Sequence, residues 1–575
     1  MKNIFFIFLL AGFIFIAKYF YQNIEDQKVG DANVIEYIPV DTEIFSGFLT
    51  PFPIKNYLHS LAANYSPSTH NLNNTKFDLF LDALYKNAIN DINNPDNILT
   101  KFGLANNVQA YLYTIDLKPV FKFQIKDANA FFEQLDLAEK KSGFTHKSLT
   151  ISNNNYRQYE LKSLYFDDGL SMVIGEHQDW ITVTFQIEKE NQEQLAQALG
   201  LKTIETSLES TNLLKELIVK NQFLKENVSF INHKSMINAL TKTDANPWRK
   251  PYLQWLDKKL MSKGLIHLQM HNVKNKWQTD ECRKALTVLA DNWPMTVFGF
   301  TNMTITPESS DINLKMVIES RNKEMLSALS QLHGFIPAQI AKLGSSAFAV
   351  GIGGNTQNLT STMSVIWNNF TKPESQCAIV AEMQSTLNAN DPMFVSMAAG
   401  MMQGLLGASF SVFDYKVETA SHFSRLSEFD GALTLSSENP LNLLNVAQTF
   451  IPRLSSIDLS KKGATVDLSP FMSSLSRFNF KPTLAVKGKN LVVYTGDKSK
   501  QFADQLATTP LSFNGLFSMS LDAKKMQPAI ANLDFIFGKD YKKQFLTNGN
   551  SQLNFHLNSN DTGVVFKSQI RMFAK

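Results

Sequence analysis

Few residues in this sequence have the types and spacing that metal binding or catalysis requires. His267 and His271 are four residues apart, a spacing that places two metal ligands on one face of a helix. However, residues 265–273 alternate between apolar and polar side chains, which is typical of a strand. Both histidines then lie on the polar outer face of that strand. We therefore do not predict a metal site here.

Paired carboxylates and a glycine-rich stretch are the other candidates for chemistry. Asp167 with Asp168, and Glu188 with Glu190, resemble the two acids of a glycosidase, but such pairs are common in turns and at helix starts. Residues 351–355 (GIGGN) follow a strand-like run, but the third glycine of a dinucleotide-binding loop is missing. The sequence also contains no P-loop, H-E-x-x-H or G-x-S-x-G motif. We predict a non-enzymatic protein without catalytic, metal or cofactor residues.

The two cysteines, Cys282 and Cys377, lie neither in a C-x-x-C pair nor near a histidine cluster. In an exported chain, two such cysteines most simply form one disulfide, whereas in a cytoplasmic chain this bond is not expected. A bond between them closes a loop of about 95 residues, which the chain-entropy model values at about 4–5 kcal/mol. We predict the disulfide, and two unrelated buried thiols are the alternative.

Residues 393–413 contain no charged side chain. Small residues recur every four positions, and several methionines add flexible apolar side chains. Three interpretations are open: a packed helix that runs into a core strand at 409–413, a groove for a hydrophobic ligand or partner helix, and a second transmembrane helix. We favour the packed helix. The candidate ligand or partner surface consists of Met393, Met397, Met401 and Met402.

The N-terminus indicates a membrane segment. Residues 4–17 are apolar and uncharged, and Lys18, Tyr19 and Tyr21 suit a membrane interface. Counted through Tyr21, the helix spans about 27 Å, close to the roughly 30 Å hydrocarbon core. No A-x-A cleavage site follows, so we favour a retained signal-anchor over a cleaved signal peptide. The rest of the chain is then exported.

Composition limits the class of protein. The chain has 575 residues, of which 44% are hydrophobic and 19% charged, which excludes wholesale disorder. Its net charge is +3, and its basic pairs are scattered along the sequence. Because nucleic-acid-binding proteins concentrate positive charge on one face, no nucleic-acid partner is expected.

The body of the chain repeats a plan of strand, helix cap and helix. One such unit has a strand at 120–125, a helix capped by Asp127, and Gly143 at the helix end. Ser320, Asn439-Pro440 and Asp497 are expected to start other helices. The strands at the centre of these units are expected at 120–125, 181–187, 312–318, 432–435, 491–494 and 516–521.

Short, Asn-rich turns between alternating strands favour antiparallel hairpins, and so an α+β fold with helices on one face of the sheet. The same dipeptide, Ile-Pro, occurs at 38–39 and at 336–337, and each copy is followed by a strand-like run. This similarity predicts two related lobes. The expected organisation is an anchor at 1–24, a tether at 25–33, a first lobe at 34–250 and a second lobe at 251–575.

The anchor, the repeated strand–helix units and an "IP-x-D-T" opening (Ile38, Pro39, Asp41, Thr42) resemble membrane-anchored envelope proteins of Gram-negative bacteria. The resemblance implies export and supplies no catalytic residue. We therefore predict a single-pass inner-membrane protein with its bulk in the periplasm. It is expected to act by binding or scaffolding, with an envelope protein or lipid as partner. The alternatives are a carrier or sensor of a hydrophobic ligand and an exported hydrolase.

Overall fold

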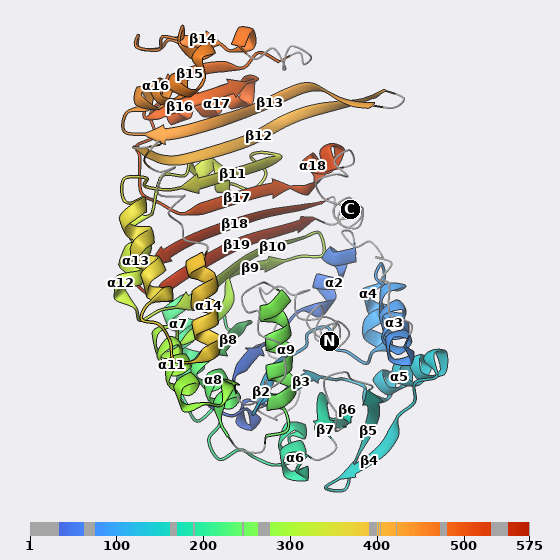
Figure 1. The fold of residues 1–575 in the computed structure, drawn as a ribbon. Helices are drawn as coiled ribbons and strands as arrows, with labels where there is room; N and C mark the ends of the chain where they lie inside the picture. Colours follow the sequence, from blue (N-terminus) through green and yellow to red (C-terminus); the bar gives the residue numbers. More distant parts are fainter. Residues whose placement is uncertain are drawn as a thin grey trace. The chain divides into compact units, whose positions relative to one another are not determined.

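The computed structural model describes residues 34–62, 75–161, 169–187, 190–243, 246–262, 276–389, 400, 402, 404–420, 423–471, 480–530 and 550–573. The chain forms two compact units, drawn in Figure 1. Unit 1 contains the chain up to Arg321 together with residues 373–388, and unit 2 contains residues 322–372 and the chain from Ala389 to Met572. The predicted anchor at 1–24 and tether at 25–33 lie outside the described residues. Within the described part, no helix is both long enough and apolar enough to cross a bilayer.

Unit 1 is built on one antiparallel sheet. Its strands pair in the order β4-β5-β6-β7-β3-β2-β1-β8-β9-β10, and every pairing is antiparallel. These strands are β1 (Ile44–Gly47), β2 (Ala110–Ile115), β3 (Lys118–Gln124), β4 (Lys147–Ile151), β5 (Asn154–Leu161), β6 (Leu170–His177), β7 (Trp180–Ile187), β8 (Val228–Asn232), β9 (Met295–Ile305) and β10 (Ser309–Glu319).

The helices of unit 1 join the strands and cover them. They are the 3-10 helix η1 (Val34–Tyr37) and the α-helices α2 (Ile54–Ala62), α3 (Lys76–Ile89), α4 (Pro95–Lys101), α5 (Ala128–Ser142), α6 (Gln192–Leu199), α7 (Leu213–Asn221), α8 (His233–Thr241), α9 (Arg249–Ser262), α11 (Asp280–Asn292) and α14 (Ala378–Ala389). The largest buried cluster of this unit combines side chains of α3, α5, α8, α9, α11 and α14 with those of β5, β6 and β7.

The strands of unit 2 also pair antiparallel, in the order β14-β15-β16-β13-β12-β11-β17-β18-β19. These nine strands match, position by position, the nine strands β5-β6-β7-β3-β2-β1-β8-β9-β10 of unit 1. The strands are β11 (Phe348–Gly353), β12 (Leu405–Ala420), β13 (Phe423–Ser437), β14 (Thr465–Asp467), β15 (Thr483–Lys487), β16 (Asn490–Thr495), β17 (Phe517–Asp522), β18 (Ser551–Asn560) and β19 (Gly563–Phe573).

The helices of unit 2 fall at comparable places along the chain. They are α12 (Lys323–Gln331), η2 (Ala338–Ala341), α13 (Leu359–Thr371), α16 (Pro440–Phe450), η3 (Pro452–Leu454), η4 (Ser469–Phe471), α17 (Asp497–Leu506) and α18 (Ala523–Ile530). The α+β class and the mostly antiparallel strands predicted from the sequence are therefore confirmed.

The two units divide after Arg321 and not near residue 250, because β9 and β10 extend the sheet that β8 belongs to. Residues 373–388, which include most of α14, lie between two stretches of unit 2 in the sequence but belong to unit 1. Sequence patterns assign neighbouring residues to the same lobe, so they do not predict that a segment between two stretches of unit 2 belongs to unit 1.

The helices cover both faces of the sheets, which corrects the prediction of helices on one face. In β16, Leu491 packs with Leu443 and Leu444 of α16, whereas Val492 packs with Phe502 of α17. Successive side chains of a strand point to opposite faces, so α16 and α17 lie on opposite sides of the sheet. In unit 1, α5 and α6 likewise join clusters on opposite faces of β6. The physical reason is that these strands are apolar on both faces.

Local capping signals were largely correct. Asp127 accepts hydrogen bonds from the backbone N–H groups of Asn129 and Ala130, and Gly143 ends α5 in the left-handed conformation with φ +65°. Two predicted caps were wrong. Asn322, not Ser320, caps α12. Asp497 is the first residue of α17, and Asp430 of β13 instead accepts from the first N–H groups of that helix.

Candidate functional site

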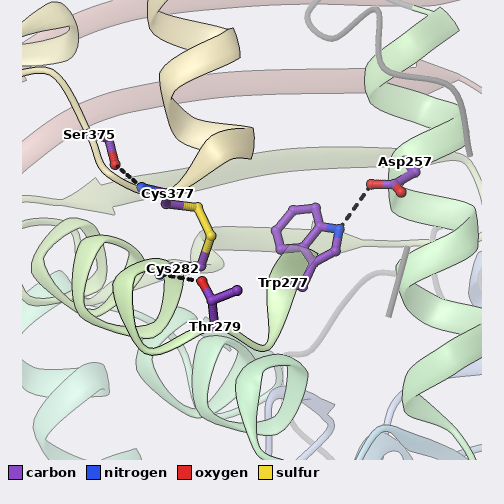
Figure 2. Close-up of a disulfide and its surroundings, with 6 residues drawn as sticks. All are labelled: Asp257, Trp277, Thr279, Cys282, Ser375 and Cys377. Carbon is purple, nitrogen blue, oxygen red and sulfur yellow. Dashed lines mark hydrogen bonds between the residues drawn. A yellow bond between two sulfur atoms is a disulfide. The ribbon is translucent and has the colours of Figure 1, made fainter. Parts of the chain in front are cut away.

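The predicted disulfide is present and lies inside unit 1. Cys282 and Cys377 are bonded, their Cα atoms are 4.3 Å apart, and both side chains are buried. As Figure 2 shows, each cysteine follows a polar side chain that fixes the local backbone. The amide of Cys282 donates to Thr279 Oγ1 (3.1 Å), the N-cap of α11, and the amide of Cys377 donates to Ser375 Oγ (3.2 Å). The disulfide thus fastens the start of α14 to the first turn of α11.

Most of the other residues considered for chemistry lie outside the described part of the chain. These are His267, His271, Asp167, Asp168 and Glu188. Glu190 is described and does not act as one of a carboxylate pair, because it forms a buried ion pair with Lys118 of β3. Within the described residues, no group of three or more His, Cys, Asp or Glu side chains could hold a metal ion.

The glycine-rich stretch at 351–355 is not a phosphate-binding loop, because Gly351 and Gly353 belong to strand β11. Their role is close packing of the backbone. A Cβ atom on Gly353 would lie 2.1 Å from the carbonyl oxygen of Gly515, and one on Gly407, its partner in β12, would lie 2.0 Å from that of Phe335. Side chains at these positions would push the covering segments off the sheet.

Of the predicted methionine surface, only Met402 is described, and Met393, Met397 and Met401 lie outside the described residues. Met402 is exposed, and its carbonyl oxygen accepts a hydrogen bond from Thr356 Oγ1 (2.9 Å). It lies in the turn before β12, which begins at Leu405, four residues earlier than the strand predicted at 409–413. Strand β12 contributes to an apolar surface on the sheet of unit 2.

That surface, which we call the apolar face, is one side of the sheet of unit 2. It contains three rows of apolar side chains that lie opposite one another on successive strands; the first row ends on β19 at a polar residue, Ser568, which lies opposite Phe555. The rows are Leu433, Phe410, Val350, Met519 and Phe555; Leu435, Ala408, Ile352, Phe517, Leu557 and Phe566; and Val412, Phe348, Leu521, Leu553 and Ile570.

The apolar face is only partly covered. Ile352 is 59% exposed, Leu433 46% and Phe410 37%, and these three side chains are neighbours because Phe410 pairs with Leu433 and lies diagonal to Ile352. Most other members of the rows are half-buried. Large exposed aliphatic and aromatic side chains that adjoin one another commonly mark a binding surface in soluble proteins. We take this face as the candidate functional site.

The opposite side of the same strands is buried. Ser409, Ser411, Ser518 and Ser520 point to that side, and each is less than 5% exposed. Ile336 and Ile340 pack onto it, with Ile336 directly over Gly351. The two faces of the central strands therefore invert the usual arrangement, since small polar residues are covered and large apolar ones are open.

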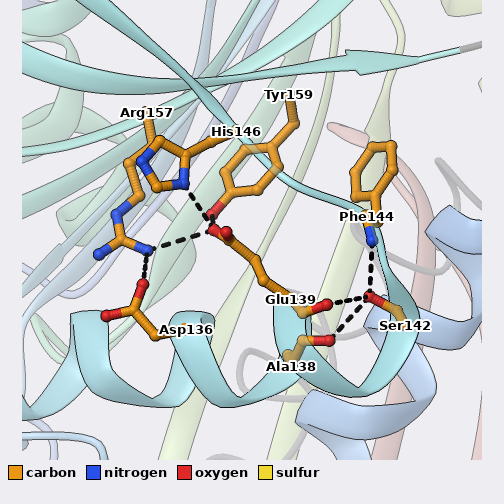
Figure 3. Close-up of polar contacts among 8 residues, drawn as sticks. All are labelled: Asp136, Ala138, Glu139, Ser142, Phe144, His146, Arg157 and Tyr159. Carbon is orange, nitrogen blue, oxygen red and sulfur yellow. Dashed lines mark hydrogen bonds and ion pairs between the residues drawn. The ribbon is translucent and has the colours of Figure 1, made fainter.

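A titratable cluster in unit 1 has a structural role (Figure 3). Glu139 Oε1 of α5 accepts from Tyr159 Oη (2.6 Å), His146 Nδ1 (2.7 Å) and Arg157 Nη1 (3.2 Å), and Arg157 also pairs with Asp136 (2.5 Å). Burial, reinforced by Glu139, raises the pKa of Tyr159 well above its usual value. Because Tyr159 is fully buried, no substrate reaches its hydroxyl group. The cluster fastens α5 to the β5 strand.

Replacing Tyr159 by phenylalanine is expected to lower the free energy of unfolding by about 1.5–3 kcal/mol, the range for a hydrogen bond to a charged group. Tyr156→Phe is the matched control, because Tyr156 is also buried in β5 but its hydroxyl group has no hydrogen-bond partner among the described residues. Urea unfolding of both variants measures the difference. Equal destabilisation by the two substitutions would contradict the assigned role of Glu139.

Comparisons with protein-family models, with curated proteins and with solved structures find no match to this chain.

Proposed function

We propose that this chain is a non-catalytic binding protein of the bacterial cell envelope, anchored by residues 1–24 in the inner membrane with its bulk in the periplasm. The buried disulfide supports export, since such bonds persist in oxidising compartments. The matching strand order of the two units supports their origin as two related lobes.

The apolar face is the observation that carries the binding function. Protein partners usually form about one hydrogen bond per 100–200 Å² of interface, which requires polar side chains on both surfaces. The three rows of the apolar face end in a single polar side chain, Ser568, whose hydroxyl group already donates to the carbonyl oxygen of Asn554. Hydrocarbon needs no hydrogen bonds, so the ligand that suits this surface best is an acyl chain of a lipid. This chemistry favours a carrier or sensor of lipid over a protein scaffold.

Native mass spectrometry of the full chain, extracted in a mild detergent that is removed in the gas phase, tests the ligand. We expect lipid-sized adducts on the wild type and their loss, by about tenfold or more, in Phe410→Glu, because a buried unpaired carboxylate costs more than the 1.4 kcal/mol that corresponds to tenfold. Val219→Glu is the control, since Val219 is 71% exposed and lies on α7 of unit 1, outside the rows. Adducts that persist in Phe410→Glu would overturn this assignment.

The compartment is tested separately in whole cells at native expression level. Protease is added after the outer membrane has been opened, and the thiols of the unfolded protein are then labelled with and without prior reduction. We expect digestion of nearly everything beyond residue 25 and labelling of Cys282 and Cys377 only after reduction. A protected chain with two free thiols would place the body in the cytoplasm and rule out the envelope role.

A further inference from the structure

Strand β3 of unit 1 carries two buried lysines on the same face, Lys118 and Lys122. Lys118 is 1% exposed and is neutralised by Glu190. Lys122 is 4% exposed and has no carboxylate partner among the described residues. Both amines are buried, but within the described part of the chain only Lys118 has a carboxylate partner. A positive charge on Lys122 would therefore have no counter-charge there.

The contacts of Lys122 Nζ are a carbonyl oxygen and an aromatic ring. It donates to Leu199 O (3.1 Å) at the C-terminus of α6, and it lies 5.9 Å from the centre of the Tyr37 ring. Gly200 ends α6 with φ +79°, and a Cβ atom there would lie 2.6 Å from Nζ. The amine therefore fits tightly between the end of α6 and η1.

Tyr37 belongs to the N-terminal lead-in, which we define as residues 34–40, the first described part of the chain. Backbone contacts hold this lead-in on the segment after α6. The carbonyl oxygen of Ile38 accepts from the amide of Leu208 (2.8 Å), and the amide of Val40 donates to Thr206 O (3.1 Å). Lys122 thus lies beneath the first described segment of unit 1.

The groups that face Lys122 leave its charge uncompensated. Tyr111 of β2 and Thr182 of β7 lie directly opposite it, and burial raises the pKa of Tyr111, which keeps that phenol neutral. Beyond Gly200, Lys202 is exposed and pairs with Glu193 at the surface. The Tyr37 ring and the carbonyl end of α6 favour the ammonium form. Burial outweighs them and lowers the pKa of Lys122 to about 7.

We propose that Lys122 is a proton-operated latch for the N-terminal lead-in: the neutral amine is buried beneath Tyr37, and protonation releases the lead-in so that water can reach the ammonium group. A buried amine is tolerated when neutral, whereas a buried, unpaired ammonium group is not. In an exported protein, the pH of the medium would then control how firmly the folded body holds the segment that leads to the membrane.

Hydrogen exchange of the full chain, one unit below and one unit above about pH 7 and corrected for intrinsic exchange rates, tests the latch. Between the pKa of Lys122 in the closed state and the ordinary lysine value, each fall of one pH unit favours the proton-linked opening by about tenfold, and below the closed-state pKa the effect levels off. We expect the amides of Val40 and Leu208, whose hydrogen bonds join the lead-in to the segment after α6, to lose protection by about tenfold at the lower pH, while β2 keeps its protection. In Lys122→Met, the protection of these amides should not change with pH.

Lys126→Met is the control, because Lys126 is exposed just beyond β3, and it should behave as the wild type. If Lys122→Met does not fold, Lys122→Gln is used in its place, because the glutamine side-chain amide can still donate to Leu199 O. Unchanged protection of the lead-in in the wild type would overturn the proposal. A loss of protection spread over all of unit 1 would also overturn it. The same result follows if the Lys122 variants show the pH dependence of the wild type.

Discussion

Replacing both Cys282 and Cys377 by alanine is expected to lower the free energy of unfolding of unit 1 by about 4–5 kcal/mol. The disulfide closes a loop of 95 residues, and the loss of that constraint increases the entropy of the unfolded chain by the corresponding amount. Calorimetry of the oxidised wild type and the double variant measures the effect. The thermal transition of unit 1 should move to lower temperature.

Reduction of the wild type provides the control for this prediction. A reducing agent should shift the transition of the wild type and leave that of the double alanine variant unchanged. Alanine is used because serine would place a hydroxyl group at two buried positions. Equal transition temperatures for the wild type and the variant would show that the disulfide does not stabilise unit 1.

Replacing Glu190 by glutamine is expected to cost about 3–5 kcal/mol at neutral pH, because it leaves the ammonium group of Lys118 buried without a counter-charge. Lys118 is 1% exposed, and its ion pair is enclosed by Trp248, whose Nε1 donates to Glu190 Oε1 (3.3 Å). Burial already lowers the pKa of Lys118, and Glu190 opposes that shift. Urea unfolding at neutral pH measures the loss.

The sign of the pH dependence follows from the same contacts. Without Glu190, the pKa of Lys118 falls further in the folded state, so the variant should regain stability as the pH rises toward the ordinary lysine value and the unfolded chain loses the same proton. The double variant Lys118→Met, Glu190→Gln should recover most of the loss. A single variant as stable as the wild type at neutral pH would contradict the buried ion pair.

Local patterns predicted those parts of the fold that depend on neighbours in sequence. The strands near 120–125 and 491–494, the Asp127 cap and the Gly143 terminus need only alternation, a short polar side chain and a residue that tolerates positive φ. The disulfide was predicted by elimination, since the chain has two cysteines.

Features that depend on tertiary contacts were not predictable in this way. Two of the first N–H groups of α17 donate to Asp430, which is distant in sequence. The hydrogen-bond partners of the Glu139 carboxylate likewise lie outside its own helix. The alternation of Lys118 and Lys122 with apolar residues is typical of a strand with one solvated face. Only the structure shows that both faces of β3 are buried, so that both amines are removed from water at a cost in free energy. Alternation in β11 and β12 identified strands, but it could not show that the apolar side remains open.

The most direct test of lipid binding at the apolar face is photo-crosslinking in whole cells. Benzoyl-phenylalanine replaces Ile352, the most exposed residue of the rows, and in a parallel strain Glu418, an exposed polar position on β12. After irradiation, intact mass and peptide mapping identify the adducts. We predict acyl-chain adducts at position 352 and none above background at position 418. Crosslinks from position 352 only to this chain or to another protein would contradict lipid binding at the apolar face.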